Sequence, residues 1–138
     1  MKVNGDSGVA VRSNGLGLGK RSKERLEQCH PDIRRVVEMA ADRFPLTVLC
    51  GHRTEAEQNE AFHKGASKLQ WPKSRHNSLP SEAVDLAPYP INWADTGRFK
   101  KMAEVVLAVA GELGVSLDWG GNWNKFIDMP HFEIRIKK

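Results

Sequence analysis

Residues 83–87 read Ala-Val-Asp-Leu-Ala, and this stretch indicates both a fold element and a candidate site. Apolar residues alternate with Asp85, which is typical of a β-strand, and Pro88 ends the run. In such a strand Val84 and Leu86 share one face, and Asp85 lies on the other face between two alanines. We therefore expect open space beside the Asp85 carboxylate.

The segments on both sides of this stretch predict a mixture of helices and short strands. Helical spacing predicts helices over 31–44, 54–64 and 99–113, with a short helix at 22–28 compatible with the sequence; β-prone runs predict strands at 46–50, 115–119 and 131–136. A long loop is expected over 66–82. About three helices and four short strands in mixed order indicate an α+β fold with a small mixed or antiparallel sheet.

Length and composition restrict the classes of protein to which the chain can belong. The 138 residues are 40% hydrophobic and 28% charged, and 21 Lys+Arg against 17 Asp+Glu give a net charge of +4. These values are typical of one globular domain, which we expect over 21–138. Glycines scattered among polar residues predict a flexible leader over 1–20. No apolar run could span a membrane or serve as a signal peptide. Cys29 and Cys50 form no metal-binding spacing, so we expect free thiols.

Two histidines and two aspartates form the candidate chemistry. His76 lies in the long loop nine positions before Asp85, and His131 begins the last predicted strand. Two imidazoles and one carboxylate can hold a catalytic zinc ion and leave its fourth position open. Asp128, three residues before His131, could then act as a general base. Residue types and spacing alone leave ordinary structural roles open for all four.

Several short motifs occur in an order that resembles a known family. They are SRH at 74–76, AVD at 83–85 and DMPHFE at 128–133, with GHRT at 51–54 and WGGNW at 119–123. Over roughly 22–136 the chain resembles the zinc-dependent D-Ala-D-Ala-type metallopeptidases of the M15 class. It is most similar to phage endolysins that cut the L-Ala–D-Glu bond of peptidoglycan. One departure is the interval between His76 and Asp85, which holds eight residues and is longer than family members commonly have.

The resemblance implies a fold and a set of residue roles. The fold would be that of the Hedgehog and DD-peptidase-like zinc peptidases. One zinc ion per chain would be held by His76, Asp85 and His131, with Asp128 as catalytic base. Arg53 would bind substrate and stabilise the developing oxyanion, although a surface arginine paired with Glu55 or Glu57 is the plainer alternative.

Other residues near these motifs are candidates for secondary roles. We expect Ser74, Trp119 and Trp123 to contribute to substrate binding, because both tryptophans flank a glycine turn close in sequence to Asp128. Glu133 shares a strand face with His131. It could therefore orient that imidazole, act as an alternative base, or simply pair with Arg135 in solvent.

Two alternative functions remain open on the sequence. One is a carboxypeptidase of the same class that removes terminal D-Ala. The other is a nucleic-acid-binding module, suggested by the net charge and by Lys68, Lys73 and Arg75 in the loop. Phosphate would be repelled by Asp85 and Asp128, so we favour the peptidase.

The favoured function carries expectations about partners and location. Peptidoglycan would be the partner, with no nucleic acid and no stable membrane insertion, and the protein would be a monomer. It would stay in the host cytoplasm until a holin-like pore releases it to the periplasm and cell wall.

Overall fold

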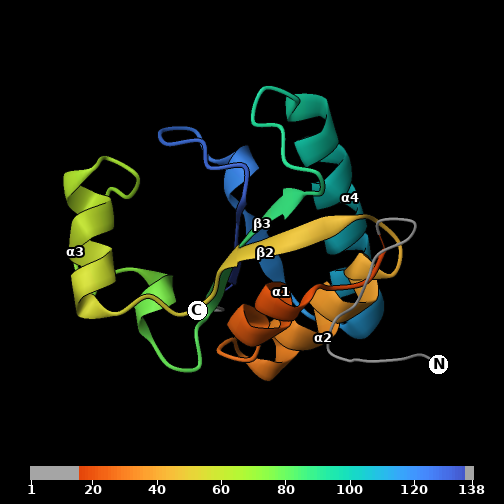
Figure 1. Ribbon diagram of the computed structural model, residues 1–138, viewed down its shortest axis with the longest axis horizontal. Helices are drawn as coiled ribbons and strands as arrows, with labels where there is room; N and C mark the ends of the chain where they lie inside the picture. The colour runs from red at the N-terminus through yellow and green to blue at the C-terminus, as the bar shows by residue number, and fades with distance from the viewer. Residues whose placement is uncertain (1–15, 136–138) are drawn as a thin grey trace.

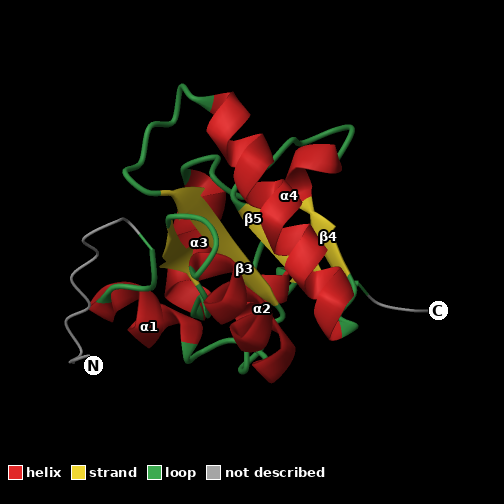
Figure 2. Ribbon diagram, turned by 90° about the vertical axis from the view of Figure 1, so that its right-hand side faces the viewer, coloured by secondary structure: helices red, strands yellow, loops and turns green. Residues whose placement is uncertain are grey.

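The structure is a computed structural model that describes residues 16–135 (Figures 1 and 2). Its helices are α1 (Lys20–Leu26), α2 (Pro31–Ala41), α3 (Glu55–His63) and α4 (Thr96–Leu113). Its strands are β2 (Leu46–Cys50), β3 (Ala83–Pro88), β4 (Leu117–Trp119) and β5 (His131–Ile134), and two short 3-10 turns are η1 (Arg75–Asn77) and η2 (Gly120–Asn122). Within 16–135, none of the helices has the length and apolar character needed to cross a membrane.

The four strands form one antiparallel sheet in the order β2-β3-β5-β4, which confirms the expected α+β architecture. Strand β3 is therefore central, between β2 and β5. In the β3–β5 pair Val84 lies opposite Phe132, and Asp85 lies opposite His131. Residues directly opposite in an antiparallel pair project from the same face, so this register gives the sheet one apolar face and one polar face.

The apolar face of the sheet forms the core with three of the helices. Val84, Leu86 and Phe132 are at most 1% exposed. Helix α4 lies against β3, α2 packs on α4, and α1 lies against β2. Helix α3 stands apart from the other three helices, and Gln58 is its one buried residue (Figure 1). The polar face of the sheet therefore remains available for a site.

Local signals explain where most of the helices begin and end. Pro31 occupies the first turn of α2, and the His30 imidazole caps it by accepting a hydrogen bond from the Asp32 amide. Thr54 and Glu57 form a capping box at the start of α3. Helix α2 ends at Ala41, earlier than expected, and residues 42–44 form a turn in which the Asp42 and Arg43 amides donate to the Met39 and Ala40 carbonyl oxygens. The turn leads into Pro45, before which helical conformation is disfavoured.

Contacts with the core begin before residue 21, where we expected the domain to start. Leu18 is only 6% exposed and belongs to the core, and the Gly17 amide donates to the Ala41 carbonyl oxygen at 2.8 Å. Helix α1 already begins at Lys20. The remainder of the expected leader, 1–15, lies outside the described residues.

Candidate functional site

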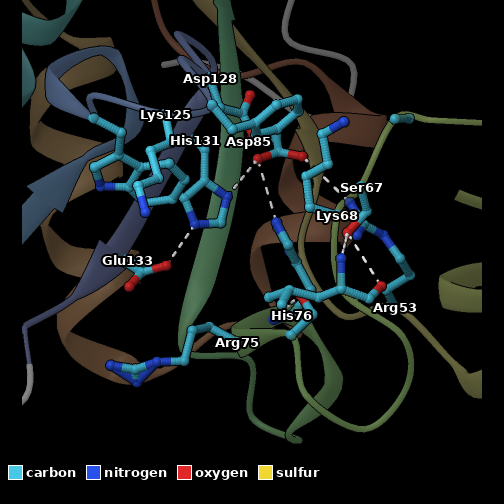
Figure 3. Close-up of a pocket in the computed structure, with 15 residues that line it drawn as sticks. Arg53, Ser67, Lys68, Arg75, His76, Asp85, Lys125, Asp128, His131 and Glu133 are labelled. Atoms are coloured by element: carbon cyan, nitrogen blue, oxygen red, sulfur yellow. Dashed lines mark hydrogen bonds and ion pairs between the residues drawn. The ribbon is translucent and has the colours of Figure 1, made fainter. Parts of the chain in front are cut away.

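Asp85 and His131 meet on the polar face of the sheet because of the β3–β5 register. His131 Nδ1 lies 3.2 Å from Asp85 Oδ1. The other ring nitrogen, Nε2, lies 2.8 Å from Glu133 Oε1, two residues along the same strand face. Glu133 therefore fixes the orientation of the imidazole and leaves Nδ1 directed at Asp85, as Figure 3 shows.

His76 reaches the same carboxylate from η1. The Ser74 hydroxyl accepts a hydrogen bond from the His76 amide at 3.1 Å and so shapes the short turn. His76 Nδ1 lies 2.7 Å from the Gly51 carbonyl oxygen, to which it donates, and Nε2 lies 3.2 Å from Asp85 Oδ1. The side chain of His76 is 2% exposed. Two imidazole nitrogens thus converge on one carboxylate oxygen.

The charges of these three groups are coupled. Burial alone would lower the pKa of His76, but the neighbouring Asp85 carboxylate outweighs it and raises that pKa to about 10. Burial would raise the pKa of Asp85, yet the charge of His76 and the hydrogen bond from His131 hold it well below its usual range. Burial also opposes the rise in the pKa of His131 that its contacts with Asp85 and Glu133 produce. Positive charge beside Asp85 is therefore strongly favoured.

The donor set suits a metal ion of the zinc type. Each imidazole has one nitrogen fixed by a partner, the Gly51 carbonyl for His76 and Glu133 for His131. This leaves the second nitrogen of each ring directed at Asp85. Such outer partners select the tautomer and orientation of histidine ligands in metal sites. Two imidazoles with one carboxylate fit a three-ligand catalytic site, and a divalent cation would supply the positive charge that Asp85 favours.

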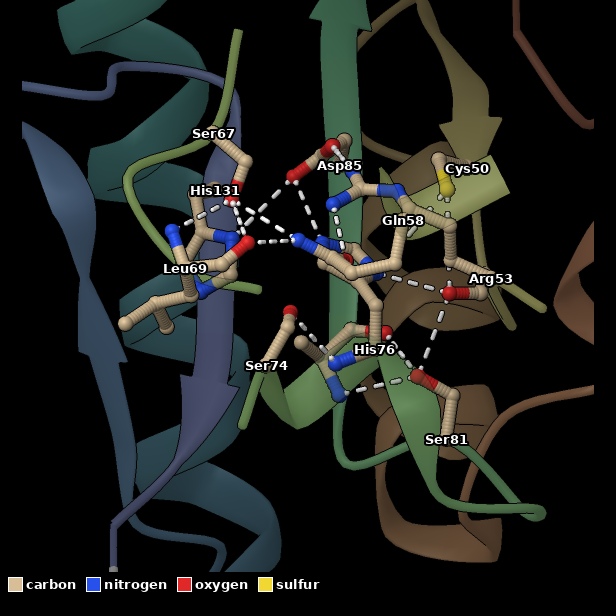
Figure 4. Close-up of polar contacts among 12 residues, drawn as sticks. Cys50, Arg53, Gln58, Ser67, Leu69, Ser74, His76, Ser81, Asp85 and His131 are labelled. Carbon is tan, nitrogen blue, oxygen red and sulfur yellow. Dashed lines mark hydrogen bonds and ion pairs between the residues drawn. The ribbon is translucent and has the colours of Figure 1, made fainter. Parts of the chain in front are cut away.

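A second set of potential ligand atoms includes a residue that the sequence did not single out. Cys50 Sγ, a His76 ring nitrogen and an Asp85 carboxylate oxygen all lie within 4.8 Å of one another. Figure 4 shows Cys50 and His131 on opposite sides of Asp85. Cys50 Sγ lies 3.9 Å from His76 Nδ1, which already bonds the Gly51 carbonyl oxygen. In the set of His76, Asp85 and His131, each histidine directs at Asp85 the nitrogen that its outer partner leaves free. Cys50 instead lies beside the His76 nitrogen that is already bonded to Gly51.

This difference predicts that the thiol is dispensable for metal binding. Cys50→Ser should bind zinc with the same stoichiometry as the wild-type protein, with Cys29→Ser as the matched control. Cys29 is buried, and burial together with Cys50 raises the pKa of its thiol to about 12, so it is not a ready metal ligand. Metal analysis of both purified variants tests the expectation. Loss of zinc in Cys50→Ser alone would make Cys50 a ligand.

A cavity of about 400 Å³ opens above these groups (Figure 3). The residues that line it include nearly all the side chains singled out on the sequence: Arg53, Ser74, His76, Asp85, Trp123, Asp128, His131 and Glu133. Segments far apart in the chain thus meet around one space: the loop after β2, the 66–76 region, β3 and the 123–133 region. The cavity is large enough for a short peptide segment to enter it.

Asp128 is positioned at the cavity by the turn before it. Its amide donates to the Gly120 carbonyl oxygen at 3.0 Å, and its own carbonyl oxygen accepts from the His131 amide at 3.1 Å. Burial and the negative charge of Asp85 raise the pKa of the Asp128 carboxyl group. A carboxylate with a raised pKa transfers protons more readily near neutral pH. Asp128 thus lines the site, and no hydrogen bond joins its carboxylate to either imidazole among residues 16–135.

Gly120 permits this arrangement, because a Cβ atom at that position would overlap the Asp128 carbonyl oxygen. Gly120→Ala should therefore lower the free energy of unfolding by about 1–3 kcal/mol through overpacking, and should reduce activity by displacing Asp128. Gly111→Ala is the matched control, since nothing lies within 4 Å of its added methyl group. This control should be stabilised by about 0.5–1 kcal/mol, because alanine favours helix. Denaturant unfolding measures both, and equal stability of the two variants would contradict the close contact.

Arg53 enters the cavity from the loop after β2. Its Nη2 lies 3.5 Å from Asp85 Oδ2, and its Nη1 donates to Gln58 Oε1 at 2.8 Å. The expected alternative pairing with Glu55 or Glu57 does not occur among the described residues. Gln58 is fully buried and also holds the 67–69 segment, as Figure 4 shows. This role of Gln58 could not be predicted from its residue type, because an isolated glutamine on a polar helix is ordinarily solvent-exposed.

The two tryptophans flanking η2 take different positions. Trp123 lines the cavity, with its ring centroid 5.1 Å from that of His131. Trp119 lies opposite Phe132 in the β4–β5 pair, stacks on it at 6.5 Å, and donates from Nε1 to the Met129 carbonyl oxygen. It is not among the residues that line the cavity. Ser74 lines the cavity, but its hydroxyl is engaged in the turn that holds His76.

Comparisons with known proteins identify relatives of the chain in sequence and in structure. Residues 15–136 match the family model described as phage L-alanyl-D-glutamate peptidase. The chain is 32% identical over 124 residues to the L-alanyl-D-glutamate peptidase of Escherichia phage T5, covering 86% of this chain and 88% of the other. It is also similar to the crystal structure of the Serratia marcescens L-Ala D-Glu endopeptidase ChiX. That match has a TM-score of 0.77 and 31% sequence identity, and covers 91% of this chain and 96% of the other.

Proposed function

The chain belongs to the phage L-alanyl-D-glutamate peptidase family, and from this premise we propose that it is a zinc peptidase of the endolysin type. Its substrate is the stem peptide of bacterial peptidoglycan, and the bond that it hydrolyses is the one between L-Ala and D-Glu. The names of the phage T5 and Serratia relatives support this choice of bond.

The observation that carries the proposal is the convergence of His76 Nε2 and His131 Nδ1 on one Asp85 oxygen, each at 3.2 Å, at the floor of the cavity. We assign the zinc ion to these three side chains. When bound there, zinc would polarise the scissile carbonyl group and increase the acidity of a water molecule. The outer hydrogen bonds from His76 to Gly51 and from His131 to Glu133 keep the imidazoles in the tautomers that this role requires.

Asp128 and Arg53 supply the remaining chemistry. In our assignment, the Asp128 carboxylate accepts a proton from the attacking water and returns it to the departing amine of D-Glu. Its raised pKa supports both halves of this transfer. Arg53 binds the carbonyl oxygen of the scissile bond and stabilises the negative charge that develops on it. Its contact with Gln58 holds the guanidinium group ready for this contact.

Digestion of purified peptidoglycan, followed by mass analysis of the fragments, tests the choice of bond. We expect stem peptides that begin with D-Glu, together with glycan strands that retain L-Ala. Release of free D-Ala would instead identify a carboxypeptidase. The three carboxylates at the cavity, Asp85, Asp128 and Glu133, disfavour the alternative of a nucleic-acid-binding module, because they would repel phosphate.

The proposed setting of the enzyme follows from its substrate. We assign it to the host cytoplasm as a monomer until a holin-like pore gives it access to the periplasm and wall. The net charge of +4 would favour its retention on acidic wall polymers.

A further inference from the structure

The substrate of the proposed reaction carries a negative charge for which no binding partner has been described so far. A glutamate residue has two carboxyl groups, and the peptide chain continues through only one of them. An L-Ala–D-Glu bond inside a longer peptide is therefore followed by a free carboxylate on the D-Glu residue. An enzyme that recognises this residue needs a cation at the cavity that is not already engaged by the protein's own acids.

Four lysine and arginine side chains line the cavity, and the two arginines are engaged by other groups of the protein. Arg53 contacts Asp85 and Gln58. Arg75 donates to Glu82 at 2.9 Å and to the Ile134 carbonyl oxygen at 2.7 Å. The other two are Lys68 and Lys125, and neither ammonium group has a carboxylate within 4.0 Å in the described part of the chain.

Lys68 is held in place, although its side chain reaches solvent. The residues on either side of it are both bound by the buried Gln58 amide, which donates to the Ser67 hydroxyl at 2.9 Å and to the Leu69 carbonyl oxygen at 2.5 Å. The Lys68 ammonium group lies 5.3 Å from the centre of the Phe126 ring, within cation–π range. The two residues that flank Lys68 are therefore held by Gln58, and its ammonium group is held by Phe126.

The same Gln58 side chain connects Lys68 to the reaction centre. Gln58 Oε1 accepts a hydrogen bond from Arg53, so one buried amide positions both Arg53 and the segment that carries Lys68. Figure 3 shows Lys68 on the side of Arg53 and Ser67, and Lys125 on the side of His131. No hydrogen bond, ion pair or ring contact of this kind holds the Lys125 ammonium group among the described residues.

We infer that Lys68 binds the free carboxylate of the substrate's D-Glu residue and is a specificity-determining residue of the cavity. This inference rests on the proposed function. A cation that is held in place, has no acidic partner and lies beside the reaction centre can bind an anion with little loss of conformational entropy. A substrate whose carboxylate is replaced by a neutral carboxamide should gain nothing from this lysine.

Two synthetic stem peptides that differ only at that group test the inference. One contains D-Glu and the other contains D-isoglutamine, its carboxamide. We expect Lys68→Met to lose about tenfold in kcat/KM on the carboxylate peptide, mostly through KM, with little change on the carboxamide peptide. Lys68→Arg should restore most of the loss. Lys64→Met is the matched control, because it also removes one positive charge but lies outside the cavity, paired with Glu60.

The possible results separate this inference from the proposed function. Equal losses on both peptides would mean that Lys68 only supports the fold of the cavity, and would overturn the inference alone. The inference would also be overturned if Lys125→Met, and not Lys68→Met, lost kcat/KM selectively on the carboxylate peptide. If the wild-type protein cleaves neither peptide while digesting peptidoglycan at another bond, the proposed L-Ala–D-Glu specificity is wrong, and the inference fails with it.

Discussion

Asp128→Asn should lower turnover by about 10²- to 10⁴-fold while zinc content and fold remain unchanged, because general-base catalysis typically contributes an effect of this size. Asparagine keeps the shape of the side chain but cannot accept a proton near neutral pH. The backbone contacts that hold position 128, to Gly120 and His131, do not involve the carboxylate and should persist. Peptidoglycan hydrolysis and metal content measured on the same preparation test this prediction.

Glu133→Gln is the comparison that distinguishes Asp128 from Glu133 as the general base. Glu133 also lines the cavity, but its Oε1 is engaged with His131 Nε2 at 2.8 Å. We expect the glutamine variant to keep most of its activity and to bind zinc more weakly, since partners of this kind typically contribute about 10- to 100-fold to metal affinity. If Glu133→Gln is inactive with zinc bound and Asp128→Asn is active, Glu133 is the base. If Asp128→Asn loses zinc, Asp128 is a ligand.

Removal of any one of His76, Asp85 and His131 should abolish zinc binding and hydrolysis together. Two remaining side chains do not hold the ion in competition with buffer, so alanine variants should contain almost no metal and show background activity. A chelator should inactivate the wild-type protein in the same way, and added zinc should restore it. Metal analysis alongside hydrolysis rates gives the measurement.

The alanine variants also separate the two possible ligand sets. His131→Ala is decisive, because the set that contains Cys50 does not need it. If His131→Ala keeps stoichiometric zinc and Cys50→Ser loses it, the third ligand is the Cys50 thiol and not His131. Thermal unfolding of each variant is the control, since His76 and His131 are buried and their removal leaves space in the structure.

Much of the site could be predicted from the sequence because its residues lie on regular elements. The alternation around Asp85 and around His131 correctly predicted two strands with polar and apolar faces. The pairing of these strands could not be predicted, because register depends on contacts between segments about 45 residues apart in sequence. We expected Trp119 to bind substrate, but the register places this β4 residue opposite Phe132 of β5. Its ring therefore lies on the apolar face of the sheet.

The contacts that position the site residues could not be predicted from the sequence. The Gly51 carbonyl group that fixes His76 carries no side-chain signal, because any residue provides a backbone oxygen. The burial of Gln58 depends on a loop, 67–69, that folds back over helix α3. Cys50 belongs to a predicted strand, and only the tertiary structure brings its sulfur near His76.

His76 and Asp85 are anchored separately, at the two ends of the segment that joins them. Gly51 fixes one, and the pairing of β3 with β5 fixes the other. Between them the buried Ser81 is bonded through its backbone to Gln28 and His30, so only the tip at 78–80 extends outward, with Leu79 69% exposed. We therefore expect insertions and deletions at this tip to change the spacing of the two residues in the sequence but not their positions in space. The same anchoring explains how this chain brings both residues together across a long interval, and it makes the tip a suitable place to graft a foreign peptide, such as an affinity tag.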